Sequence, residues 1–155
     1  ARFSAVTSIA VDLASAINSA MPHHVVDLVA EALNSTGKAV RGSRVLIVGV
    51  AYKENIDDDR ESPSYEIIEL LEEAGARVDY CDPFFPAARP GRKHQLALSS
   101  VPCTAEAFGR YDAVVLSTAH TAFKDPALYA QVGLLVDTRN AVKLPPGAAT
   151  RLVKA

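Results

Sequence analysis

The sequence predicts an α/β fold: a doubly wound, mainly parallel sheet with helices on both faces, preceded by an N-terminal helix. Short apolar or β-branched runs alternate with segments of helical periodicity, and they lie at residues 45–50, 77–81, 113–117 and 134–137. The first run is apolar throughout, which is typical of a strand buried on both faces of a parallel sheet. Strands that alternate with helices are joined by right-handed crossovers, and these give a doubly wound sheet.

Two helical stretches are expected before the first strand. Residues 22–36 carry apolar side chains at helical spacing, Pro22 suits a first helical turn, and Gly37 follows as a stop signal. Residues 1–20 are also helix-compatible, and residues 18–19 are expected to break the helix before Pro22.

Further elements follow the first strand. A helix is predicted to begin at Pro63, with Ser62 as its N-cap, and to end at Gly75. The remaining expectations are a helix near residues 94–98, a strand near Val101, a helical turn at 104–108, a helix at 125–131 and an irregular tail at 145–155.

Composition excludes several classes of protein. The chain has 155 residues, 49% of them hydrophobic, and its net charge of −2 gives no electrostatic case for binding nucleic acid or an anionic membrane. The longest apolar run, at 45–52, is too short to span a bilayer. Cys81 and Cys103 indicate neither a disulfide framework nor a metal site, so a reduced, cytoplasmic setting is the default expectation.

Candidate ligand-binding residues lie where strands end, because a doubly wound, Rossmann-like sheet binds ligands at the carboxyl ends of its strands. Residues 49–53 follow the first strand without the glycine-rich loop that approaches a pyrophosphate in a self-sufficient NAD site. Lys53, and Arg139 after the last predicted strand, can instead supply positive charge to one anionic ligand such as a nucleotide diphosphate. The alternative for Lys53 is a solvated surface side chain, and the alternative for Arg139 is a salt bridge to Asp137 or to another chain.

Other polar residues support weaker hypotheses. The loop at 53–61 has seven charged residues among nine, and Arg60 near its end either meets an anion at the helix start or pairs with a neighbouring carboxylate. The aspartates at 57–59 match no calcium-loop spacing, so no metal site is predicted. Asp82 is interpreted as a turn former and His120 as a structural residue, and no catalytic nucleophile is predicted.

A set of motifs in a fixed order carries a family resemblance. They are Gly49-Val50-Ala51-Tyr52-Lys53, Arg60-Glu61-Ser62-Pro63, Tyr80-Cys81-Asp82-Pro83, Thr118-Ala119-His120 and Asp137-Thr138-Arg139-Asn140. Together they resemble the C-terminal UDP-binding domain of the UDP-glucose/GDP-mannose dehydrogenases, over about residues 10 to 143. The form of the motifs is most similar to the UDP-N-acetylglucosamine and UDP-N-acetylmannosamine dehydrogenase branch.

The resemblance implies a role in NAD-dependent oxidation of the C6 hydroxyl of a UDP-sugar to a carboxylate, for nucleotide-sugar and cell-surface polysaccharide biosynthesis. It assigns residues 1–36 to the end of a central dimerisation helix of a homodimer, and 37–155 to a C-terminal UDP-sugar-binding domain. NAD is bound mainly by an N-terminal domain in this family. The chain contains neither a glycine-rich NAD loop nor a Gly-Gly-x-Cys nucleophile segment, so it is not expected to catalyse the oxidation by itself.

Residue by residue, the resemblance assigns Tyr52 and Lys53 to the UDP-sugar, with Lys53 at the diphosphate. It assigns Arg139 to the same substrate and Arg60 to NAD held by the other domain. It gives no role to His120, no catalytic residue and no metal ligand.

Two other functions are alternatives to nucleotide-sugar binding: one stays open and the other is disfavoured. A non-enzymatic dimerisation module with no independent ligand site is the alternative function, because the apolar stripe of residues 22–36 could pack against a symmetry mate. A receiver domain of a response regulator would fit the architecture, but no lysine follows a later strand as that function requires.

Overall fold

The computed structural model describes residues 2–87 and 98–155, and a five-stranded sheet organises them. The strands are β1 (Arg44–Val48), β2 (Arg77–Cys81), β3 (Ala113–Leu116), β4 (Leu134–Asp137) and β5 (Arg151–Lys154). They lie in the order β2-β1-β3-β4-β5, and every neighbouring pair is parallel. The predicted α/β fold is confirmed.

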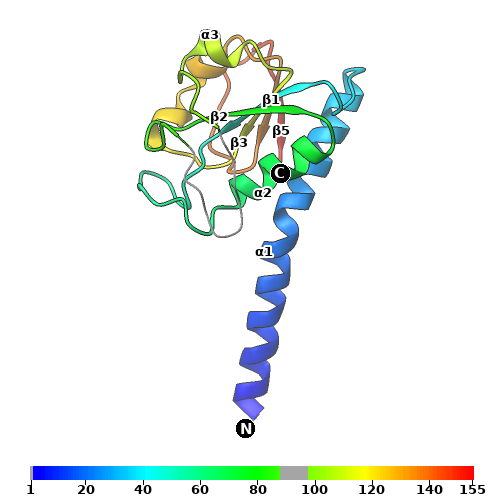
Figure 1. Ribbon diagram of the computed structural model, residues 1–155, viewed down its shortest axis with the longest axis vertical. Coiled ribbons are helices and arrows are strands. Elements are labelled where there is room, and N and C mark those ends of the chain that lie inside the picture. The colour runs from blue at the N-terminus through cyan, green and yellow to red at the C-terminus, as the bar shows by residue number, and fades with distance from the viewer. Residues whose placement is uncertain (1, 88–97) are drawn as a thin grey trace.

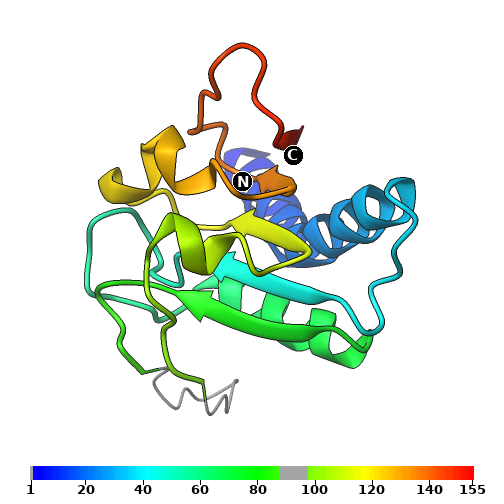
Figure 2. The same cartoon turned by 90° about the horizontal axis from the view of Figure 1, so that it is seen from above.

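Helices cover both faces of the sheet. They are α1 (Arg2–Ser35), α2 (Pro63–Glu73), α3 (Ala105–Phe108) and two short 3₁₀ helices, η1 (Thr121–Lys124) and η2 (Pro126–Tyr129). Alternate side chains of β1 enter different cores: Val45 and Ile47 pack with α1 and α2, whereas Leu46 packs with Phe108 of α3 and Tyr129 of η2. Figure 2 shows α1 and α2 on one side of the sheet and α3 on the other.

The N-terminal helix is continuous, so the prediction of a break at residues 18–19 is wrong. Pro22 lies inside α1 and removes one backbone hydrogen bond. Its side chain is buried in one stripe with Val25 and Val29, so packing against the sheet domain offsets that loss. The N-terminal half of α1 extends away from the sheet (Figure 1). Within the described residues, no helix is both long and apolar enough to cross a membrane.

The elements at residues 62–75 and 104–108 form as predicted. Ser62 caps α2 by accepting a hydrogen bond from the Ser64 N–H, and Pro63 is its first residue. In place of one helix at 125–131 there is the short 3₁₀ helix η2, and a second 3₁₀ helix, η1, precedes it at 121–124. The helix predicted near residues 94–98 lies almost wholly outside the described residues.

Two strand predictions are corrected. The tail predicted as irregular contains β5, whose four residues include only two apolar ones and therefore give almost no periodicity. Around Val101 there is no strand among the described residues; Ser100 forms a single parallel bridge to Tyr80.

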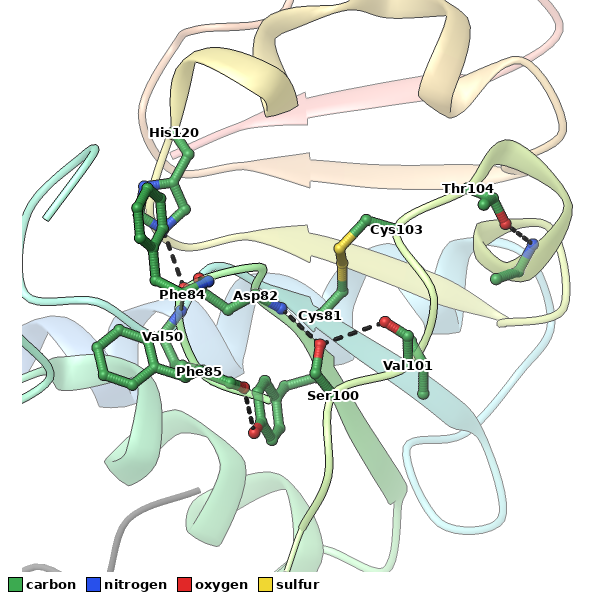
Figure 3. Close-up of a disulfide and its surroundings, with 12 residues drawn as sticks. Val50, Cys81, Asp82, Phe84, Phe85, Ser100, Val101, Cys103, Thr104 and His120 are labelled. Carbon is green, nitrogen blue, oxygen red and sulfur yellow. Dashed lines mark hydrogen bonds and ion pairs between the residues drawn. A yellow bond between two sulfur atoms is a disulfide. The ribbon is translucent and has the colours of Figure 1, made fainter. Parts of the chain in front are cut away.

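Cys81 and Cys103 form a disulfide, which corrects the prediction from the cysteine count (Figure 3). The Val101 N–H donates to the Tyr80 carbonyl at 2.8 Å, which lays the following segment beside β2. The two cysteine Cα atoms are thereby 5.9 Å apart although they are separated by 22 positions. The cysteines no longer favour a reducing compartment, and the cytoplasmic setting stays a prediction.

Reduction of the disulfide is expected to lower the free energy of unfolding by about 3 kcal/mol, because the bond restricts a loop of 22 positions in the unfolded chain. Urea unfolding with and without dithiothreitol measures this difference. Cys103→Ser is the control, since its free energy of unfolding should equal that of the reduced chain and should not change when dithiothreitol is added. Two thiols that react with an alkylating agent in the folded, unreduced chain would contradict the pairing.

Candidate functional site

The carboxyl ends of four parallel strands meet at one edge of the sheet, and each leads into a loop with a candidate residue. Lys53 follows β1, Asp82 follows β2, His120 follows β3 and Arg139 follows β4. The structure therefore brings Lys53 and Arg139 to the same edge, on the two sides of β3. Ligands of such sheets bind at this edge.

The turn after β1 is shaped by contact with the turn after β3. Gly49 has a φ of +87°, and a Cβ atom there would lie 2.3 Å from the Thr118 carbonyl oxygen. The Gly49 N–H donates to the Cys81 carbonyl at 2.9 Å. Glycine is therefore required here so that two backbone turns can approach each other.

A buried carboxylate holds this turn. Asp82 is fully buried, and its Oδ2 accepts hydrogen bonds from the N–H groups of Val50 at 2.8 Å and Ala51 at 3.2 Å. Its Oδ1 accepts from the Phe84 N–H at 2.9 Å (Figure 3). Burial by itself would raise the pKa of Asp82, but the hydrogen bonds from His120, Val50 and Phe84 outweigh it and lower that pKa.

The same hydrogen bonds decide whether NAD fits at this turn. In a dinucleotide-binding fold the amides that follow the first strand face a pyrophosphate. Here the amides of Val50 and Ala51 donate to Asp82 instead, so these two amides are not free to bind a second anion. The turn after β1 does not fit an NAD pyrophosphate.

Tyr52 and Lys53 lie on the exposed side of this turn. Tyr52 is 43% exposed, and the Lys53 Nζ lies 5.5 Å from the centre of the Tyr52 ring. The Tyr52 N–H donates to the Asp58 carbonyl at 2.6 Å, which fixes the backbone. An ammonium group over an aromatic ring at an open edge can receive an anionic ligand with a flat, apolar neighbour.

Arg139 is fixed beside the end of β3. Its Nε donates to the Ser117 carbonyl at 2.8 Å. The Asp137 carboxylate, considered as its ion-pair partner, accepts instead from the backbone N–H groups of Arg139, Ala141 and Val142, each at 2.9 Å. The Arg139 guanidinium therefore stands at the candidate edge with a defined orientation.

Arg60 pairs with a neighbouring carboxylate, as the simpler of its two interpretations predicts. Its Nε donates to Asp58 Oδ1 at 3.0 Å and its Nη2 to Oδ2 at 2.9 Å. The hydrogen bonds and the charge of Asp58 raise the pKa of Arg60. Its assignment to NAD stays a prediction.

Asp82 and His120 are the residues that the sequence did not identify as a pair. His120 Nε2 and Asp82 Oδ2 are 2.9 Å apart, with both side chains buried, although 38 positions separate them. No spacing rule relates an aspartate after one strand to a histidine after another; only their shared place at strand ends hinted at proximity. Over residues 2–87 and 98–155 no three His, Cys, Asp or Glu side chains are grouped so that they could hold a metal ion.

A cavity lies elsewhere on the domain. It measures about 460 Å³ and is lined by Arg44, Tyr111, Asp79 and residues of α3. Arg44 begins β1 and Tyr111 precedes β3, so this cavity is near the amino ends of the strands. The Tyr111 hydroxyl donates to Asp79 at 2.8 Å and its ring lies 5.0 Å from the Arg44 guanidinium, so these polar groups already have partners.

Comparison with known proteins decides the family. The model of the UDP-glucose/GDP-mannose dehydrogenase family, UDP binding domain, matches residues 46–144. The chain belongs to this family. The match contains the loops after β1, β2, β3 and β4, and it confirms the resemblance based on the motifs.

Individual relatives agree with this membership. UDP-N-acetyl-D-glucosamine 6-dehydrogenase of Pseudomonas aeruginosa is 31% identical over 109 residues, which cover 70% of this chain and 25% of that protein. UDP-N-acetyl-D-mannosamine dehydrogenase of Methanococcus maripaludis is 34% identical over 109 residues, covering 70% and 23%. The crystal structure of an NDP-N-acetyl-D-galactosaminuronic acid dehydrogenase from Methanosarcina mazei Go1 has a TM-score of 0.73 at 28% identity, covering 92% of this chain and 30% of that one. The chain spans about a quarter of the length of the curated relatives it matches.

Asp82→Asn is expected to lower the free energy of unfolding at neutral pH by about 2–3 kcal/mol, because an amide cannot accept all the hydrogen bonds that the buried carboxylate accepts. The folded-state pKa of Asp82 lies below its ordinary value of 3.8, so this advantage of the wild type is present above 3.8 and is lost as the pH falls through the folded-state pKa. Urea unfolding across this pH range measures it. Glu106→Gln, in an exposed pair with Arg110, is the control and should change stability little. Equal stability of Asp82→Asn and the wild type at neutral pH would contradict this account.

Proposed function

We propose that this chain binds the uridine diphosphate part of a UDP-sugar at the carboxyl edge of its sheet, as part of an NAD-dependent UDP-sugar 6-dehydrogenase. The observation that supports this most is that Lys53 and Arg139 lie at one edge. Asp82 holds the turn that precedes Lys53, and the Arg139 backbone N–H donates to Asp137. Family membership and the names of the relatives point to the same ligand.

The two cations suit a diphosphate in different ways. The ammonium of Lys53 acts as a point charge, whereas the Arg139 guanidinium can donate two parallel hydrogen bonds to phosphate oxygens. Tyr52 beside Lys53 offers an aromatic face to the nucleotide. In this proposal the chain holds the anionic end of the substrate and leaves the C6 hydroxyl to be oxidised by residues of the whole enzyme.

The finer parts of the proposal rest on the relatives. A UDP-N-acetylhexosamine is the proposed sugar nucleotide, because relatives that act on UDP-N-acetylglucosamine and UDP-N-acetylmannosamine, by their names, match the chain. NAD is the proposed oxidant of the whole enzyme, with Arg60 as its contact on this chain. A homodimer built through residues 1–36, with 37–155 as the UDP-sugar-binding domain, stays a prediction.

Lys53→Ala and Arg139→Ala are each expected to weaken binding of UDP-N-acetylglucosamine by about ten- to a hundredfold, because each removes a charge-assisted hydrogen bond to phosphate. Isothermal titration calorimetry measures the Kd. Lys38→Ala is the matched control. Lys38 forms an ion pair with Asp112 near the amino ends of β1 and β3, away from the candidate edge, so its removal should leave the Kd unchanged.

Uridine separates charge recognition from base recognition. It should bind more weakly than UDP, and Lys53→Ala should not affect its binding. No binding of UDP or of the UDP-sugar at millimolar concentration, with an unchanged circular dichroism spectrum, would contradict the proposal and favour a dimerisation module without a ligand site.

A further inference from the structure

His120 occupies a closed position behind the loop that carries Tyr52 and Lys53. Its side chain is 1% exposed, and its ring contacts the rings of Phe84 and Phe123, whose centroids are 4.8 Å and 5.4 Å away. Figure 3 shows the Phe84 ring against the imidazole. Packing on these rings restricts the imidazole to an orientation in which both nitrogens have partners.

The hydrogen bonds show which imidazole nitrogen of His120 is the acceptor and which is the donor. The Asn55 N–H donates to His120 Nδ1 at 2.7 Å, so Nδ1 is an acceptor and carries no proton. The proton of the neutral ring is therefore on Nε2, which donates to Asp82 Oδ2 at 2.9 Å. One imidazole thus connects a loop amide to the buried carboxylate.

Asn55 is held at its other groups as well. Its backbone has a φ of 59°, in the left-handed region that non-glycine residues seldom adopt. Its Nδ2 donates to Thr121 Oγ1 at 2.9 Å, and the Thr121 N–H donates to its Oδ1 at 3.0 Å. Three hydrogen bonds to the segment after β3 therefore maintain a backbone shape that the residue would not favour alone.

Lys53 lies in the chain between two fixed points, the amides held by Asp82 and the amide held by His120. Asp82 and His120 are themselves hydrogen-bonded to each other. Asp82 holds Val50 and Ala51 on one side, and His120 holds Asn55 on the other. The loop that presents the ammonium is thus fixed at both ends before any ligand arrives. A loop fixed in advance loses less conformational entropy when a ligand binds.

We propose that His120 is a positioning residue for the nucleotide site, and that its two nitrogens have separable tasks: Nδ1 sets the shape of the Tyr52–Lys53 loop, whereas Nε2 stabilises the fold through Asp82. The effect on affinity rests on the proposed binding of a UDP-sugar at this edge. The effect on the loop does not, because it exists without ligand.

Two amide replacements separate the two nitrogens. The Oδ1 of asparagine is as many bonds from Cβ as Nδ1, so His120→Asn can still accept from the Asn55 N–H but cannot reach Asp82. The Nε2 of glutamine is as many bonds from Cβ as the imidazole Nε2, so His120→Gln can still donate to Asp82 but leaves the Asn55 N–H without its acceptor. Phe123→Leu is the control for lost packing, because it reduces a ring contact and removes no hydrogen bond of this link.

We expect His120→Gln to weaken binding of UDP-N-acetylglucosamine by about three- to tenfold in calorimetry, as the loss of one buried hydrogen bond would. His120→Asn should keep the wild-type Kd although it lowers the melting temperature. Phe123→Leu should also lower the melting temperature without changing the Kd. Equal Kd values for His120→Gln and the wild type, or equal weakening by His120→Gln and His120→Asn, would overturn the proposal.

Hydrogen exchange of the ligand-free chain keeps this test separate from the test of the proposed function. The Asn55 amide should exchange about tenfold faster in His120→Gln than in the wild type or in His120→Asn. If the wild type binds no UDP-sugar but this pattern appears, the proposed function fails and the positioning role stands. If exchange at Asn55 is unchanged in His120→Gln, the positioning role fails.

An exposed variant covers the case in which neither histidine variant folds. Thr121→Val removes the Oγ1 that accepts from Asn55 Nδ2 and keeps the shape of the side chain. It should speed exchange at Asn55 and weaken binding in the same direction as His120→Gln, by about twofold. Unchanged exchange at Asn55 in this variant would contradict the proposed anchoring.

Discussion

The carboxylate of Asp82 is the interaction on which the rest of the candidate site depends. It accepts hydrogen bonds from the amides of Val50 and Ala51 and from His120 Nε2. The loops after β1, β2 and β3 are therefore joined at one buried charge. A buried charge is tolerated only when its hydrogen-bonding capacity is used, and this one is used by groups from three loops. The amides of Val50 and Ala51 are therefore already occupied, and in the proposed function the positive side chains at this edge meet the ligand instead.

The proposed function requires a Rossmann-like sheet to bind a nucleotide without a glycine-rich loop, and this arrangement is compatible with that. In the usual site, backbone amides approach the pyrophosphate. In this chain, the Asp82 carboxylate occupies those amides. In the proposed function, Lys53 and Arg139 therefore meet the charge of the ligand instead. The single glycine of the turn, Gly49, serves the approach to Thr118.

Much of the fold could be predicted from the sequence because its signals are local. The apolar run of β1 predicts a buried strand, and Ser62-Pro63 predicts the start of α2; each signal lies within a few residues. The errors occur where distant packing decides: Pro22 continues a helix because the sheet domain buries it, and the short β5 exists because β4 offers an edge. The site divides in the same way, since Lys53 is visible at a strand end whereas the Asp82–His120 contact exists only in the folded chain.

The most direct test of the central claim is a titration with UDP-N-acetylglucosamine followed by the backbone amide chemical shifts of the chain. We expect the changes to concentrate at residues 49–55, 117–121 and 137–140, which form the loops at the carboxyl edge. Changes centred on the cavity beside Arg44 and Tyr111, with the edge loops unaffected, would contradict it.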